Sequence, residues 1–166
     1  MNKGTLILLL TITAFSLKAQ STAVKDIGEV VDAWHLAAAN ADFNAYFNIL
    51  TEDAVFVGTD AAEVWNKSEF MAFSKPYFEK GKAWSFTSKQ RNVYVDASGE
   101  IAWFDELLDT WMLLCRGSGV LKKEDGVWKI SHYVLSLTIP NDEIQKVITV
   151  KKESDSLFLK SLIEKH

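Results

Sequence analysis

One change of pattern constrains the fold of this chain more than any other feature. Up to Gly81 the apolar residues mostly recur at helical spacing, whereas from Ala83 onward they lie in long runs rich in Thr, Val and aromatic residues. Turn chemistry at residues 96–99 and at Asp125-Gly126 divides the second half. We therefore expect an α+β fold in which a meander of long antiparallel strands follows the helices. Such long strands twist strongly, so the sheet should curl and, closed by the N-terminal helices, form a cone with a central pocket.

The expected elements follow from spacing and capping residues. A first helix is expected over residues 24–40, a second after Asp42, and a third from Asn66 or Ser68 to Gly81. A short strand at residues 54–57 separates the second helix from the third. The long strands are expected over residues 84–95, 101–115, 116–123 and 127–139, and a last helix after Pro140.

The N-terminus has the pattern of a secretory signal peptide. A positively charged start at Lys3 precedes an apolar run from Leu6 to Phe15, and Ala19 is the small residue at the expected cleavage point. The run is too short for a transmembrane helix, which needs about 20 apolar residues. We expect a removed signal over residues 1–19, one domain over 20–140 and a helical extension over 141–166. The mature protein should be periplasmic or secreted, without membrane contact.

Composition excludes several classes of function. The formal net charge is −4 and the chain has only two arginines, Arg91 and Arg116, which argues against nucleic-acid binding. The single cysteine, Cys115, allows no disulfide within the chain and should be a small buried apolar residue. His35 and His132 have no metal-ligand spacing, so we expect neither a metal nor another cofactor. Six Trp, ten Phe and four Tyr provide more aromatic surface than folding requires.

Several segments together resemble one known family. They are the long first helix with Trp34, Thr51–Asp60, Trp65, Ala102–Glu106, Arg116–Leu121, Asp125–Ile130 and His132–Ser136. Over about residues 24–140 the chain is similar to the SnoaL-like branch of the nuclear transport factor 2-like superfamily. The resemblance implies a conical, cystatin-like α+β fold with a central pocket, often as a homodimer. It implies no single activity, because relatives include cyclases, isomerases, epoxide hydrolases, dehydratases and non-catalytic binding domains.

Alternation along the last strand suggests which residues face the pocket. One face carries Trp128, Ile130, His132, Val134 and Ser136, and its apolar start places it inward. A two-residue loop at Asp125-Gly126 would pair His132 with Gly119, which leaves open space above the imidazole. His132 is then a polar anchor or general base, or else a core histidine satisfied by a hydroxyl or carbonyl.

A carboxylate could complete the site. Asp105 and Glu106 point to opposite faces of their strand, so only one of them can lie inside, and the sequence does not decide which. The inward one could form an acid–base dyad with His132, or an ion pair with Lys89 or Arg91. Asp60 is a better candidate for a turn cap than for the pocket mouth. Arg116 should form an ion pair on the outer face of the sheet.

These residues support two functions of different classes. The first is binding of a small apolar or aromatic molecule; the alternative is a cofactor-free lyase, isomerase or cyclase using His132 with Asp105 or Glu106. A structural domain with a filled core is a third reading. An apolar outer face of Tyr133, Leu135, Leu137 and Val120 predicts a homodimer. The candidate ligand contacts are Trp34, Tyr46, Asp60, Trp65, Trp103, Gly119, Trp128 and Ser136.

Overall fold

A computed structural model describes the backbone of residues 3–164 and the side chains of residues 20–164. The predicted signal peptide, residues 1–19, lies outside the residues whose side chains are described. The helices are α1 (Lys3–Ala39), α2 (Phe43–Asn48), α3 (Lys67–Glu79) and α4 (Ile144–Ile163), with a short 3-10 turn η1 (Asn141–Glu143) before α4. The strands are β1 (Leu50–Val57), β2 (Val64–Asn66), β3 (Thr87–Val95), β4 (Ile101–Thr110), β5 (Leu113–Glu124) and β6 (Val127–Leu137).

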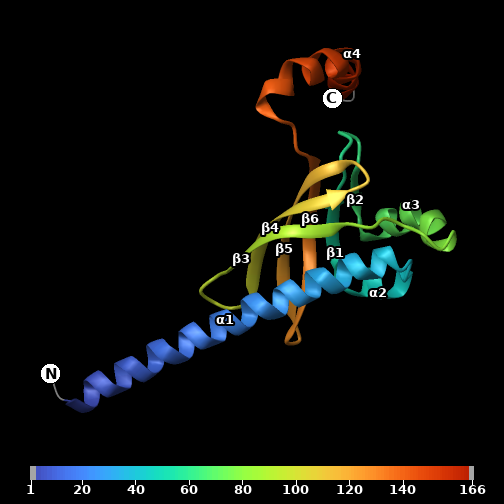
Figure 1. The fold of residues 1–166 in the computed structure, drawn as a ribbon. Helices are drawn as coiled ribbons and strands as arrows, with labels where there is room; N and C mark the ends of the chain where they lie inside the picture. Colours follow the sequence, from blue (N-terminus) through green and yellow to red (C-terminus); the bar gives the residue numbers. More distant parts are fainter. Residues whose placement is uncertain (1–2, 165–166) are drawn as a thin grey trace.

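A single curled, unclosed sheet organises the domain. Its strand order is β2-β1-β6-β5-β4-β3, and every neighbouring pair is antiparallel except β1 with β6. Helix α1 lies across β3 and β6, and α3 packs against β1 and β2 (Figure 1). The predicted α+β cone fold is therefore confirmed. Cys115 lies in its core, free and fully buried, as the sequence predicts.

Local chemistry fixes the ends of the predicted helices. Asp42 accepts a hydrogen bond from Ala45 N at 2.9 Å and begins α2. Asn66 begins α3 with a capping box, in which its side chain accepts from Glu69 N and Glu69 accepts from Asn66 N. Gly81, with a φ of 74°, follows the C-terminus of α3. These interactions depend only on sequence neighbours, which explains why the predicted starts of α2 and α3 were correct, whereas α1 extends beyond the predicted residues 24–40 at its N-terminus.

A bulge in β6 overturns the predicted orientation of its second half. Ile130 pairs with Leu121 and His132 with Val120, so Ser131 is an extra residue between them. Ser131 is buried, and its hydroxyl donates to Val120 O at 3.2 Å. The extra residue reverses the alternation beyond it. Tyr133 and Leu135 therefore face the core, whereas His132, Val134 and Ser136 face outward.

The turn between β4 and β5 also differs from the prediction. The sequence suggested a strand through Cys115, but the chain reverses at Trp111-Met112. Thr110 explains the turn: its hydroxyl donates to Leu113 O and accepts from Met112 N, both at 2.9 Å. This earlier reversal brings Trp111 and Met112 to the edge of the cone.

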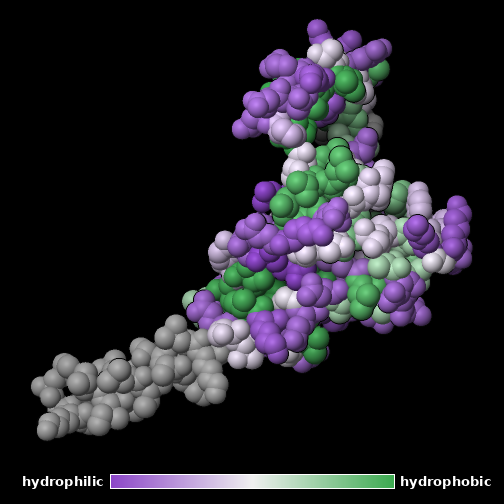
Figure 2. All heavy atoms as spheres, viewed as in Figure 1, coloured by the Kyte–Doolittle hydropathy of each residue, from purple (hydrophilic) through white to green (hydrophobic). Residues whose placement is uncertain are grey.

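Helix α4 occupies the C-terminal segment and stands apart from the sheet (Figure 1). No residue of α4 is buried, and both hydrophilic and hydrophobic residues are exposed on its surface (Figure 2). Among the residues searched, which are those that the structure describes, no helix is long and apolar enough to cross a membrane.

Candidate functional site

An aromatic cavity opens at one end of the cone. It has a volume of about 140 Å³. Its floor is buried, with Phe56 7 %, Phe70 2 % and Leu135 6 % exposed, whereas Trp111 at its rim is 79 % exposed. The lining comes from β1, β2, β6, α3 and three connecting segments and comprises Phe56, Gly58, Thr59, Glu63, Trp65, Phe70, Phe73, Trp84, Phe86, Trp111, Met112 and Leu135.

The rings of this lining stack on one another. The Trp65 and Phe70 rings lie 5.6 Å apart at an interplanar angle of 19°, and Phe70 and Trp84 lie 5.9 Å apart at 27°. Phe56 stacks on Phe70 at 4.0 Å. Parallel rings of this kind present flat apolar faces, which suit an aromatic or planar apolar guest.

A buried carboxylate forms a polar network deeper in the cone. Glu106, with no exposed surface, accepts from Arg91 Nε and Nη2 at 3.0 and 2.9 Å through Oε2. Its Oε1 lies 2.8 Å from His35 Nε2 and accepts from the Tyr133 hydroxyl at 3.2 Å. Arg91 Nη1 donates to Gly28 O at 3.0 Å and lies 2.8 Å from Asp32 Oδ1. The network thus joins α1, β3, β4 and β6.

Charge and burial compete at Glu106. Burial raises the pKa of its carboxyl, but hydrogen bonds and positive charge from His35 and Arg91 outweigh burial and hold the pKa below the usual value. Burial, reinforced by the neighbouring Glu106 charge, raises the pKa of Tyr133 well above its usual value. The carboxylate is therefore the acceptor and the tyrosine hydroxyl a donor.

Gly117 makes room for this arrangement. A Cβ there would overlap the Tyr133 hydroxyl and come within 3.0 Å of Glu106 Oε1. The close approach of Tyr133 to Glu106 therefore requires glycine at this position on β5.

The cavity and the network are adjacent. His35 packs edge-on against Phe86, with ring centroids 6.1 Å apart, and Tyr133 lies 5.5 Å from Phe56. Both phenylalanines line the cavity. Two buried polar atoms behind the same wall, Trp34 Nε1 and Tyr46 Oη, have no hydrogen-bond partner among the described residues. Burial raises the pKa of Tyr46, and the nearby Trp84 offsets only part of that rise.

The predicted histidine–carboxylate pair is not present. Glu106 is the inward carboxylate and pairs with Arg91, one of the two cations considered for it. His132 lies on the opposite face because of the bulge at Ser131, so the two cannot meet. Asp105 is also outside, where Arg116 lies 3.6 Å from it, as expected for an outer-face ion pair.

Several predicted contacts nevertheless gather on the outer face. Trp103, Asp105, Gly119 and His132 line a shallow hollow of about 300 Å³. Trp103 is 46 % exposed and stacks on Tyr94 at 5.9 Å, so it does not line the cone. Gly119 does not leave open space: a Cβ there would overlap the Phe104 ring.

Of the predicted ligand contacts, only Trp65 lines the cavity. Trp34 and Tyr46 are core residues behind its wall, and Trp128 is buried elsewhere, with Lys123 Nζ 4.8 Å from its ring centroid. Asp60 caps its turn by accepting from Ala62 N at 2.9 Å. Ser136 is exposed.

The sequence does carry a signal for His35 as a site residue. His35 stands four residues after Val31 and three before Ala38, on the buried stripe of α1. A histidine on such a stripe needs a polar partner from the sheet, and Glu106 provides it.

Solved structures share the fold at low sequence identity. An NTF2-like protein of unknown function from Pseudomonas putida KT2440 is 18 % identical, with a TM-score of 0.62 over 74 % of this chain and 91 % of that one. A candidate dehydratase of the NTF2-like family from Streptomyces avermitilis is 16 % identical, with a TM-score of 0.62 over 72 % and 99 %. The association domain of CaMKII from C. elegans is 20 % identical, with a TM-score of 0.59 over 71 % and 98 %.

No curated protein matches the sequence. The family model described as a SnoaL-like domain matches residues 27–140, which is more than half of the chain. The match runs from α1 to the end of the sheet and includes the cavity and the polar network. The fold is that of NTF2-like proteins, and by this match the chain belongs to the SnoaL-like family.

Proposed function

We propose that this SnoaL-like domain, exported by way of residues 1–19, binds a small apolar molecule with a single aromatic ring. The observation that carries the proposal is the aromatic cavity of about 140 Å³. An engineered apolar cavity of about 150 Å³ is known to bind benzene, so the volume suits one six-membered ring. Stacked Trp65, Phe70 and Trp84 supply the flat surfaces that such a ring packs against.

The polarity of the lining suggests how the ligand lies. Phe56, Phe70 and Leu135 make the floor apolar, whereas Thr59 and Glu63 contribute polar atoms elsewhere in the lining. Glu63 Oε2 accepts from Asp60 N at 3.1 Å, which holds it in the loop between β1 and β2. A ring with one polar substituent would therefore place the ring on the floor and the substituent toward this loop.

Native mass spectrometry of protein purified from its own host tests this proposal. We expect a retained small molecule with aromatic absorbance, released when the protein is denatured. Leu135→Phe adds volume on the cavity floor and should abolish retention. Leu137→Phe is the matched control, because Leu137 follows on the same strand, is 51 % exposed and does not line the cavity. Protein without a bound small molecule in every preparation, or equal retention of the molecule by both variants, would contradict the proposal.

The second candidate is proton-transfer catalysis, with His35 in the role first considered for His132. Glu106 Oε1 lies 2.8 Å from His35 Nε2, and a carboxylate in this position orients an imidazole. His35 also contacts Phe86 of the cavity lining. The candidate dehydratase among the structural relatives is compatible with this chemistry.

His35→Asn separates the two candidates. A binding domain should retain its ligand in this variant, because the cavity lining is unchanged. An enzyme should lose turnover of the retained compound while still binding it. Unchanged turnover in His35→Asn would remove His35 from the role of base.

We also propose that the chain forms a homodimer through the outer face of its sheet. The predicted surface is corrected, since Tyr133 and Leu135 face the core, but exposed Tyr94 and Trp103 take their place. An association domain among the structural relatives is compatible with self-association. Light scattering at micromolar concentration should give a mass above that of one chain, and this mass should fall in Trp103→Glu. A monomer mass in the unmodified protein, or an unchanged mass in Trp103→Glu, would refute the proposal.

A further inference from the structure

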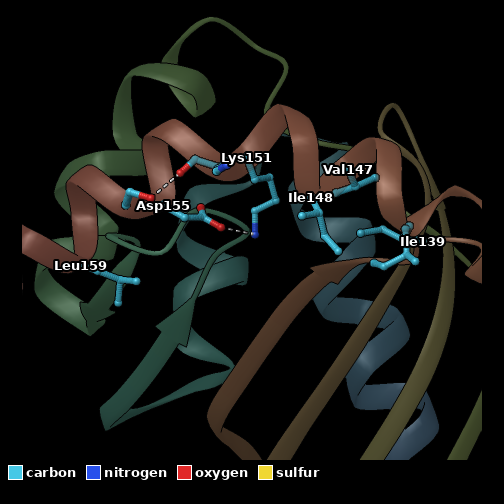
Figure 3. A pocket seen from close by; sticks show the side chains of 9 residues that line it. Ile139, Val147, Ile148, Lys151, Asp155 and Leu159 are labelled. Carbon is cyan, nitrogen blue, oxygen red and sulfur yellow. Dashed lines mark hydrogen bonds and ion pairs between the residues drawn. The ribbon is translucent and has the colours of Figure 1, made fainter.

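Helix α4 is long, and its apolar side stays exposed among the residues that the structure describes. Its 20 residues span about 30 Å, yet none of them is buried. Ile144, Ile148 and Leu162 are 41, 50 and 43 % exposed. A hollow of about 310 Å³ runs along this face, where Ile139, Val147, Ile148 and Leu159 line it (Figure 3). An amphipathic helix of this length is ordinarily stabilised by packing of its apolar face.

Six residues on this face lie at heptad spacing, four of them apolar and the central two charged. We call this row of residues the seam. Successive seam residues are separated alternately by four and three positions, which is the spacing of a and d positions in a two-stranded coiled coil. Val147 and Leu159 flank the seam. The six seam positions are Ile144, Ile148, Lys151, Asp155, Phe158 and Leu162.

The seam is symmetric about Glu153. When a second copy of α4 is laid antiparallel and centred on this residue, every a position meets a d position of the other copy. Ile144 then lies opposite Leu162, Ile148 opposite Phe158, and Lys151 opposite Asp155. Apolar residues meet apolar residues at both ends, and opposite charges meet twice in the middle.

The two central charges select one orientation. In a parallel pair, Lys151 would face Lys151 and Asp155 would face Asp155, both repulsive. In the antiparallel pair both contacts are attractive. Within one helix Lys151 Nζ lies 3.2 Å from Asp155 Oδ2, so both groups already point to the same side (Figure 3). A charged layer inside an apolar seam fixes register and orientation at some cost in stability.

We propose that α4 pairs with α4 of a second copy of this chain as an antiparallel two-helix coiled coil centred on Glu153. The contact is separate from the outer-face contact and does not depend on the cavity. It assigns the C-terminal extension a role as a self-association element.

Cysteine cross-linking tests the pairing directly. Ile144→Cys and Leu162→Cys chains are prepared separately, mixed in equal amounts and oxidised. We expect a disulfide-linked dimer in the mixture and none from either variant alone, since each new cysteine faces the other position. Native Cys115 is present in every one of these chains, but it is fully buried, so a cross-link reports the introduced cysteines. Cross-linking of either variant with itself would show parallel pairing, and no cross-link in the mixture would show unpaired α4; both overturn the proposal.

Charge exchange provides the second test. Lys151→Asp and Asp155→Lys each place like charges together, so each should weaken α4 association by at least about tenfold, measured as the amount of cross-link formed when each substitution is added to both cysteine chains. Mixing a Lys151→Asp chain with an Asp155→Lys chain should restore association. Each of these chains lacks its own intrahelical pair, so restoration reports the contact between copies.

Two results would overturn the inference at this point. One is equal cross-linking in all charge variants, which would mean that the central charges do not meet. The other is binding of α4 to anionic phospholipid vesicles with no cross-link in their absence, which would make lipid the occupant of the apolar face.

Discussion

Removing the charge of Glu106 tests whether the buried network holds the cone together. In Glu106→Gln the side chain keeps its size, but Arg91, whose side chain is only 11 % exposed, loses its buried counter-charge. The amide NH₂ must also face either Arg91 or the Tyr133 hydroxyl, both of which donate to the carboxylate. The variant therefore removes the buried counter-charge of Arg91 and leaves at least one donor without a suitable acceptor.

The expected loss is about 3 kcal/mol. Breaking a buried ion pair by removing one partner costs about 3–5 kcal/mol. We take the lower end because Arg91 retains Asp32 and Gly28 O as partners. With a urea m value near 2 kcal/mol/M, the unfolding midpoint should fall by about 1.5 M.

The neighbouring Asp105 supplies the matched control. Asp105→Asn likewise replaces a carboxylate of β4 by its amide. The Asp105 side chain, however, is 34 % exposed, and that of its partner Arg116 is 56 % exposed. Solvent screening limits such a pair to about 0–1 kcal/mol, so Asp105→Asn should shift the midpoint by less than about 0.5 M. Equal midpoints for the two variants would refute the reasoning, because the network would then stabilise no more than a surface pair.

The pH dependence of the free energy of unfolding is a second test of the Glu106 carboxylate. The folded pKa of Glu106 lies below the unfolded value near 4.5, so its ionisation stabilises the fold above that pH. This contribution is lost as the pH falls through the folded pKa. The difference between the protein and Glu106→Gln should therefore shrink when urea unfolding is repeated below pH 4.5, and a constant difference would contradict this assignment.

Three further substitutions test the packing around the site, each read from urea unfolding. Gly117→Ala should cost about 1–3 kcal/mol, because its methyl group overlaps the Tyr133 hydroxyl. The loss should be smaller in a Tyr133→Phe background, and an equal loss would contradict the overlap. Gly28→Ala should stabilise α1 by about 0.5–1 kcal/mol, since only Arg91 Nη1, at 4.0 Å, approaches the new methyl group; a loss of stability would contradict this. Thr110→Val should cost about 1–2 kcal/mol and change Trp111 fluorescence, because two hydrogen bonds of the turn disappear; an unchanged midpoint would contradict the role of the hydroxyl.

Local chemistry could be predicted from the sequence because its partners are close along the chain. The caps at Asp42 and Asn66 need only a neighbour three residues away. The hairpin at Asp125-Gly126 needs positive φ angles, 50° and 82°, that these two residues tolerate. Together with the long strands, these signals were sufficient for the α+β cone.

The orientation of His132 could not be predicted by extending one alternation. The insertion of Ser131 depends on a contact with Val120 O on the neighbouring strand, which no local signal shows. The hydrophobic pattern did contain a trace of it. Trp128 and Ile130 are apolar at even positions, whereas Tyr133 and Leu135 are apolar at odd ones, and such a change of phase within a strand indicates a bulge.

The cavity was located only in part because much of its lining comes from the segments that connect helices and strands. Trp84 and Phe86 precede β3, and Trp111 lies in the turn after β4. Face alternation places residues within strands but says nothing about where a connecting segment turns. The strand prediction therefore put Trp103 inside, whereas the reversal at Trp111 determines which tryptophan reaches the cavity rim.

Calorimetric titration with phenol tests the central claim most directly, because phenol is a single ring with one polar substituent. We predict saturable binding at one site per chain, lost in Leu135→Phe and retained in Leu137→Phe. Absence of saturable binding to the unmodified protein, or equal binding by Leu135→Phe, would contradict a ligand site in the aromatic cavity.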